Sequence, residues 1–273
     1  MRAIATFDAG TDGGVGNGLA SWFGAALTWP LGSLLERESQ GSAFFLARTR
    51  ADERAPSREF HPLSTGWEAM RQELLLEPET AHVLYMREYL GRALVHVRSS
   101  TIRVHRPNAE AQLVFGEEFG GLGDPGFCSR AVEFLVAALD NVNPAFAWLG
   151  ADAPATEETN LDWVLDRRVR DSVREARKLL RGYSWTTVCP GELSERLGGP
   201  AALAATGAFH KVFPLAAGGV VLQATRTAAE YSDDAVRRVF EALHPVLPPG
   251  MPQFDLAHPE LRYFPADASR FSG

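Results

Sequence analysis

The chain has 273 residues, of which 45% are hydrophobic, and a formal net charge of −7 at pH 7. This length and apolar content predict a globular protein with a sizeable core. The acidic balance argues against a general nucleic-acid binder, which needs a basic face, and leaves room for a basic protein partner. Cys128 and Cys189 are the two cysteines and form no C-x-x-C pair, so we expect reduced, buried thiols in a cytoplasmic protein.

The first residues predict a strand followed by a glycine-rich loop. Ala3–Phe7 has the composition of a strand, and the run Gly10–Gly18 follows it where a phosphate-binding loop would lie. The chemistry of such a loop is missing, because Leu19 and Ala20 stand where a Walker loop has Lys and Ser or Thr. The third glycine of a G-x-G-x-x-G motif is missing as well. The run therefore predicts a flexible loop.

Gly13–Leu35 carries no charge, which raises the question of a targeting or membrane segment. A signal peptide has a basic flank and an unbroken apolar core, whereas aspartates precede this run and glycines interrupt it. Its apolar part is also shorter than the roughly 20 residues that span a bilayer. The helical spacing of apolar residues from Leu19 to Leu27 instead predicts a helix that packs on the core and ends at Pro30. We expect no membrane association.

Residues 40–116 predict strands, one helix and a polar insert. Ser42–Ala47 has the pattern of a strand, and the charged segment Arg48–Pro62 predicts a surface loop. Trp67–Leu76 predicts a helix that stops near Pro78.

Ala93–His105 predicts a hairpin with a two-residue turn at Ser99 and Ser100. This register would place Val97 opposite Ile102 and Val95 opposite Val104 on one face. The other face would carry two histidines and two arginines: His96, Arg98, Arg103 and His105. Metal-binding imidazoles do not usually lie among arginines without a carboxylate, and the hairpin brings no third ligand. We therefore expect a solvated polar face and no metal site.

The middle of the chain predicts two helices separated by a connection. Asp124 is a suitable N-cap for a helix over Gly126–Leu139, which has a broad apolar side. Ala151–Glu158 has the composition of a linker, so it either separates two lobes or is a long connection within a single domain over residues 1–273. A second helix is expected over Asn160–Arg181, with charges of alternating sign on its outer face. Such a face is usually solvated.

Tyr183–Gly250 carries the densest local signals of the chain. It predicts a strand over Tyr183–Val188, two short helices, a hairpin across Gly218 and Gly219, and a helix over Asp233–Leu243. Together with the N-terminal strands, this order predicts an α+β fold with a mainly antiparallel sheet covered by helices.

The pattern of this region resembles the immunity proteins of type VI secretion and polymorphic toxin systems. The resemblance covers a little over a third of the chain and implies a non-enzymatic protein that binds and neutralises a cognate bacterial toxin. It supplies no catalytic motif and no cofactor. The segments that carry it are Trp185 in a strand, Leu197-Gly198-Gly199 at a helix end, Leu222-Gln223-Ala224-Thr225 in a hairpin, Leu247-Pro248-Pro249 after the last helix, and Asn143-Pro144-Ala145-Phe146 upstream.

The alternative is a small-molecule enzyme of unrecognised type with its site in a cleft between sheet and helices. No G-x-S-x-G, H-E-x-x-H, C-x-x-C or EF-hand motif occurs in the sequence, so we predict no catalytic residue, metal or cofactor. The candidates for toxin contact lie in the acidic glycine loop. Phe119 would be an aromatic anchor, and Glu117, Glu118 and Asp124 would form a charged rim. The same carboxylates could also be a cation site, an acid/base pair or a solvated loop.

Overall fold

The computed structural model describes residues 1–30, 42–48, 57–62, 67–76, 80–85, 95–99, 108–116, 119–151 and 158–271. Its strands are β1 (Arg2–Phe7), β2 (Ser42–Arg48), β3 (Ser57–Pro62), β4 (Thr80–Tyr85), β5 (Val95–Ser99), β6 (Ala109–Val114), β7 (Phe146–Gly150), β8 (Thr186–Cys189), β9 (Lys211–Pro214) and β10 (Val220–Gln223). Its α-helices are α1 (Gly14–Thr28), α3 (Trp67–Leu75), α4 (Pro125–Leu139), α5 (Asn160–Val164), α6 (Val169–Glu175), α7 (Gly191–Arg196), α8 (Gly199–Ala205) and α9 (Asp233–Leu243).

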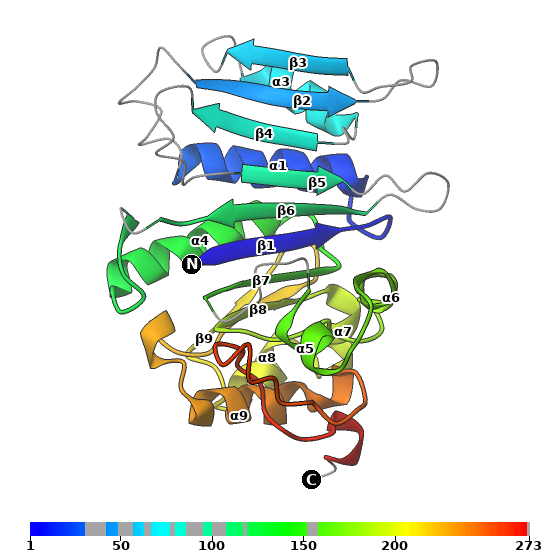
Figure 1. Cartoon of the computed structure of the whole chain (residues 1–273), viewed down its shortest axis with the longest axis vertical. Helices are drawn as coiled ribbons and strands as arrows, with labels where there is room; N and C mark the ends of the chain where they lie inside the picture. The colour runs from blue at the N-terminus through cyan, green and yellow to red at the C-terminus, as the bar shows by residue number, and fades with distance from the viewer. Residues whose placement is uncertain are drawn as a thin grey trace.

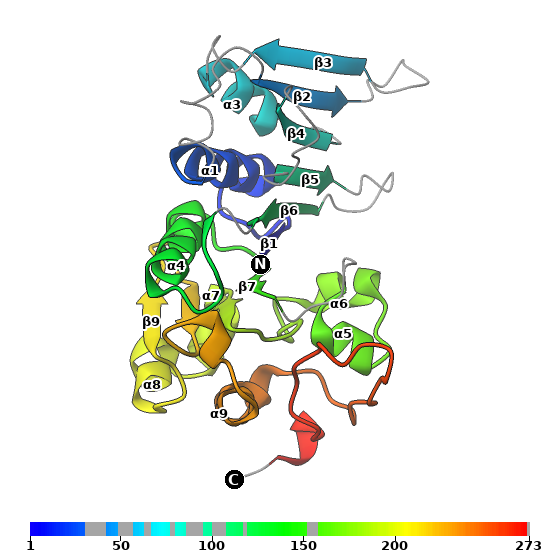
Figure 2. The same ribbon diagram turned by 60° about the vertical axis from the view of Figure 1, so that its left-hand side comes forward.

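The ten strands form one sheet in the order β3-β2-β4-β5-β6-β1-β7-β8-β10-β9 (Figure 1). Every neighbouring pair is antiparallel. Helices α1, α3 and α4 lie on one side of the sheet, and α5 and α6 lie on the other (Figure 2). The expected α+β fold with an antiparallel sheet is confirmed.

The core includes β1, the central strand that connects the two halves of the sheet, and residues Ala3–Phe7 of this strand are buried. β1 pairs with β6 on one edge and with β7 on the other, and all five residues of β7 are buried. The helices α1 and α4 close the core over this region, where the Trp22 and Phe134 rings meet edge to face at 5.0 Å. Aromatic pairs of this geometry add to the apolar area that both helices bury.

The C-terminal third follows the predicted order closely. Strand β8, the short helices α7 and α8, the β9–β10 hairpin and helix α9 occupy the expected segments within a few residues. Asp124 also caps α4 as expected, since its carboxylate accepts from the backbone N–H groups of Gly126 and Phe127. Among the described residues, no helix has both the length and the apolar character needed to cross a membrane.

The glycine run differs from the prediction, because α1 already begins at Gly14. A flexible loop over the whole of Gly10–Gly18 is therefore wrong. A Cβ on Gly16 would lie 2.7 Å from the Leu75 carbonyl oxygen, and a Cβ on Gly18 would lie 2.4 Å from the Phe7 ring. The glycines thus allow α1 to pack closely on α3 and β1, which is a packing role that the search for a phosphate loop does not detect.

The predicted hairpin at Ala93–His105 is also wrong. Strand β5 lies between β4 and β6, so Val97 is opposite Ala81 on one side and Ala111 on the other. Both edges of β5 are occupied, which leaves no edge for a partner that includes Ile102. The turn at Ser100 and the histidine at position 105 lie outside the described residues.

Two further segments depart from the prediction, and a third is only partly described. The expected surface loop Arg48–Pro62 contains strand β3, which pairs with β2. The single helix expected over Asn160–Arg181 is divided into α5 and α6, with Asp166 between them in a left-handed conformation at φ 49°. Most of the proposed connection, residues 152–157, lies outside the described part of the chain.

Candidate functional site

The loop predicted to contact a toxin is only partly described. Glu117 and Glu118 lie outside the described residues. Phe119 is half-buried in an aromatic cluster, with its ring 6.2 Å from the Trp29 ring and 6.3 Å from the Phe115 ring. Asp124 uses one carboxylate oxygen to cap α4. The structure therefore gives Phe119 a packing role and Asp124 a capping role, and the contact of this loop with a partner stays a prediction.

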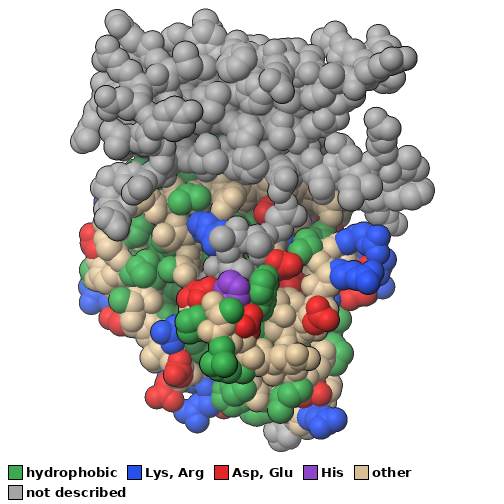
Figure 3. Space-filling view, viewed as in Figure 1, with side chains coloured by type: hydrophobic (Ala, Val, Ile, Leu, Met, Phe, Trp, Pro, Cys, Tyr) green, Lys and Arg blue, Asp and Glu red, His purple; other side chains and the backbone are tan. Residues whose placement is uncertain are grey.

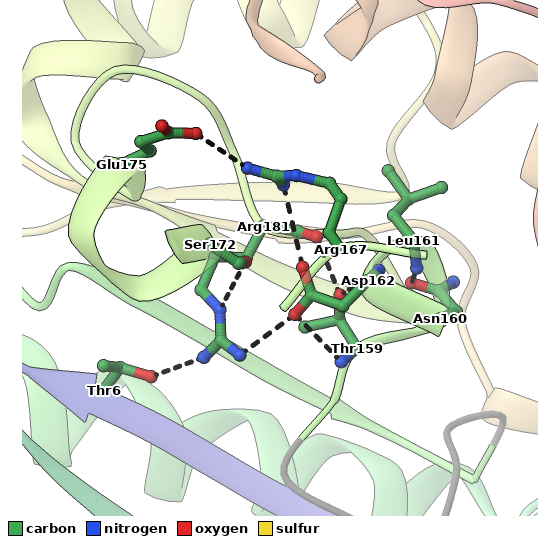
Figure 4. Close-up of polar contacts among 9 residues, drawn as sticks. All are labelled: Thr6, Thr159, Asn160, Leu161, Asp162, Arg167, Ser172, Glu175 and Arg181. Atoms are coloured by element: carbon green, nitrogen blue, oxygen red, sulfur yellow. Dashed lines mark hydrogen bonds and ion pairs between the residues drawn. The ribbon is translucent and has the colours of Figure 1, made fainter. Parts of the chain in front are cut away.

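A buried ion pair, Arg181 with Asp162, forms the centre of a polar network (Figure 4). Both side chains are almost fully buried, and Arg181 Nη2 lies 3.0 Å from Asp162 Oδ2. The Arg181 guanidinium also donates from Nη1 to Thr6 Oγ1 on β1 and from Nε to Ser172 Oγ on α6, each at 3.1 Å. One arginine thus connects β1, α5 and α6.

The Asp162 carboxylate is held by its own helix terminus. Asp162 Oδ2 accepts from the Thr159 backbone N–H, and Thr159 Oγ1 accepts from the Asp162 backbone N–H, which is a capping box at the start of α5. Asp162 Oδ1 faces Arg167 Nη1 at 3.6 Å, and Arg167 Nη2 contacts Glu175 at 3.1 Å. Because the carboxylate and the Arg181 guanidinium are closed to solvent, we assign this network to structural support of the segment 159–181.

The charged face expected to be solvated is thus turned inward in part, at Asp162 and Arg181, whereas other charges of the segment, such as Arg170 and Arg174, are exposed. Another residue of the same segment, Arg177, donates to Asp8 at the end of β1, to Glu192 on α7 and to the Asn143 carbonyl. A Cβ on Gly10 would lie 2.4 Å from Arg177 Nε, so glycine leaves room for the guanidinium. The prediction of a solvated face is wrong at Asp162, Arg177 and Arg181 because α5 and α6 are separate and their charges follow no single helical period.

Both cysteines are free thiols and are buried, as expected. Burial raises the pKa of the Cys128 thiol and raises that of Cys189 to about 12. Neither thiol is therefore poised as a thiolate nucleophile at neutral pH. Among the described residues, no three His, Cys, Asp or Glu side chains are grouped so that they could hold a metal ion.

The pKa of Cys189 predicts a pH-dependent loss of stability. Above pH ~9 the Cys189 thiol ionises in the unfolded chain but stays neutral in the folded chain. The free energy of unfolding therefore falls as the pH rises from about 9 towards 12. By pH ~10, the wild-type free energy of unfolding should have fallen by about 1–2 kcal/mol more than that of Cys189→Ala. Urea unfolding of both proteins at several pH values checks this, and parallel pH profiles would contradict it.

The C-terminal segment displays a group of exposed hydrophobic side chains that the sequence patterns did not single out. Met251, Phe254 and Leu256 are 65%, 73% and 85% exposed, and we call them the C-terminal apolar patch. In Figure 3, hydrophobic side chains and carboxylates lie side by side on the lower part of the face, where Figure 1 draws this segment in front. Large apolar side chains concentrated at one exposed place are typical of interaction surfaces.

The backbone beneath this patch is fixed to helix α5. The Gln253 backbone N–H donates to the Val164 carbonyl at 2.7 Å, and Trp163 Nε1 donates to Asp255 Oδ2 at 2.9 Å. The His258 ring meets the Trp163 ring edge to face at 4.5 Å. The side chain of Asp255 therefore turns towards the body of the protein, while those of its neighbours Phe254 and Leu256 remain exposed.

Comparison with known proteins gives one structural likeness. No protein-family model and no curated protein sequence matches the chain. Among solved structures, the chain is similar to one described as Pseudomonas aeruginosa T6SS protein PA0821, where T6SS denotes the type VI secretion system. The TM-score is 0.56 and the identity 15%, over 96% of this chain and 77% of that one. At this identity the likeness shows a shared fold.

Proposed function

We propose that the chain is an immunity protein that binds and neutralises a cognate toxin of a type VI secretion or polymorphic toxin system. The observation that carries the proposal is the shared fold, which extends over nearly the whole chain and is found in a protein described as part of the type VI secretion system. The sequence pattern around Trp185, which resembles immunity proteins, supports the same function from a different direction. We further propose that the protein acts in the cytoplasm, where its two thiols stay reduced.

The chain would neutralise the toxin by binding to a surface that the toxin needs for its activity. The net charge of −7 favours a basic partner, because complementary fields speed association and suppress wrong partners. A sheet of ten strands with helices on both sides gives such a binder a rigid frame, so little ordering has to occur on binding.

Co-expression tests this function. The gene next to that of the immunity protein is expected to encode the toxin, and its induction alone should stop growth of a heterologous bacterial host. Simultaneous production of the chain should restore growth, whereas an unrelated acidic protein of similar size should not. Continued growth arrest in cells that contain soluble, folded chain would contradict the proposal.

Within this proposal, the acidic loop predicts an electrostatic contribution to binding. The double variant Glu117→Lys/Glu118→Lys should associate more slowly with the toxin and show a weaker dependence on salt concentration, because two rim charges are reversed. Stopped-flow association rates at several ionic strengths measure both effects. Glu133→Lys/Glu241→Lys, which makes the same change in net charge at exposed positions on α4 and α9, is the control for charge alone. Association rates in the double variant equal to those of the control would remove this loop from the contact surface.

A further inference from the structure

The C-terminal apolar patch has the properties of a prepared binding surface. Three backbone or side-chain anchors, from Gln253, Asp255 and His258, hold the segment on α5. The Asn160 amide also holds the segment further on, since it donates to the Arg262 carbonyl. Because the backbone is already fixed, a partner that buries Phe254 and Leu256 pays little conformational entropy for the segment. Large side chains on such a support are the usual residues that dominate binding energy.

The border of the patch is anionic. Asp255 accepts from the Ala257 backbone N–H and from the Trp163 indole, and these hydrogen bonds hold its pKa below the ordinary value. The hydrogen bond from His258 has the same effect on the pKa of Glu260. Both carboxylates are thus ionised at neutral pH. The nearby Arg262 is paired with Asp233 at 2.8 Å, so its charge is offset.

The negative charge at the border of the patch favours one kind of partner over the others that bind exposed apolar side chains. A second copy of the chain would bring the carboxylates of two patches together, and an anionic membrane surface would repel them. A basic protein surface with an apolar pocket would meet both the patch and its border favourably.

We infer that the C-terminal apolar patch, Met251, Phe254 and Leu256, with the carboxylates of Asp255 and Glu260 at its border, is the surface through which the chain docks onto a basic protein. The inference rests on the proposed function, because the basic protein is taken to be the toxin. Phe254 and Leu256 would fill an apolar pocket of the toxin, and Glu260 would face its basic side chains.

Binding kinetics of matched variants test the inference. Phe254→Ser and Leu256→Ser should each weaken binding of the protein encoded by the adjacent gene by at least about 30-fold, mainly through faster dissociation. The control is Leu76→Ser, which changes a leucine of comparable exposure, 61%, beside α3 at the opposite end of the molecule. Its affinity should equal that of the wild type. Biolayer interferometry measures the rates, and circular dichroism checks that each variant is folded.

A charge variant measures the contribution of the anionic border to binding separately from that of the apolar side chains. Glu260→Lys should slow association, whereas Glu133→Lys on the distant helix α4 should not. Equal binding by the wild type, Phe254→Ser and Leu256→Ser would overturn the inference and leave the proposed function intact. Failure of the wild type itself to bind would contradict the proposed function, and the inference would fall with it.

Two further measurements test whether the patch instead binds a second copy of the chain or a lipid surface. Sedimentation velocity of the free wild type should show a monomer, and a dimer that Leu256→Ser abolishes would overturn the inference in favour of a second copy. Co-sedimentation with phosphatidylcholine vesicles should be absent. Vesicle binding that is lost in Leu256→Ser would overturn it in favour of a lipid surface.

Discussion

Asp162→Ala is expected to lower the free energy of unfolding by about 3–5 kcal/mol, because it leaves the buried Arg181 guanidinium without its counter-ion. The two side chains have 0% and 1% exposure, and their ion pair connects α5 to β1 and α6. The loss of the capping box at Thr159 adds to the effect. Urea unfolding followed by tryptophan fluorescence measures the change.

An exposed pair provides the control for this variant. Asp234 lies 3.2 Å from Arg237 on α9, but both side chains are at least half exposed, so Asp234→Ala should cost no more than about 1 kcal/mol. The double variant Asp162→Ala/Arg181→Met should be more stable than Asp162→Ala, since it removes the unpaired charge as well. A loss for Asp162→Ala as small as that for Asp234→Ala would show that the network does not support the fold.

Trp185→Ala should lower the free energy of unfolding by about 3–5 kcal/mol, the usual cost of removing a buried indole. Trp185 is 1% exposed beside β8, and its indole Nε1 donates to the Thr225 carbonyl at 3.0 Å. The variant would therefore leave a cavity, whereas the Thr225 carbonyl would keep the hydrogen bond that it accepts from Gln223 Nε2. The same urea unfolding measures the loss, with Leu76→Ala as an exposed control. A loss below about 1 kcal/mol would contradict the packing described for this residue.

Local signals explain why the C-terminal third could be predicted from the sequence. Gly218 has a positive φ of 97° in the turn of the β9–β10 hairpin, so a single residue fixes this boundary. In the middle of the chain, Asp124 fixes the start of α4 in the same way. The pairing of β5 with β6 could not be predicted in this way. Its partner residues are separated by up to eighteen positions, as for Val95 and Leu113, and the local pattern fits a tight hairpin equally well.

The polar network was missed for a related reason. A continuous helical period places Arg181 on the charged side, but the chain turns at Asp166 and the arginine points inward. The spacing of Thr159 and Asp162 as a capping box was the available signal for a helix start there. The C-terminal apolar patch lies in an irregular segment, and neither helical nor strand periodicity describes it.

Titration of toxin activity with the purified chain tests the central claim most directly. A protein that neutralises by binding should lower the activity in proportion to its amount and abolish it at an equimolar ratio, with a stable complex of both proteins on size exclusion. The alternative, a small-molecule enzyme, would leave the activity of the toxin undiminished. Complete inactivation by a small fraction of an equivalent, or undiminished activity in molar excess of folded chain, would contradict the account.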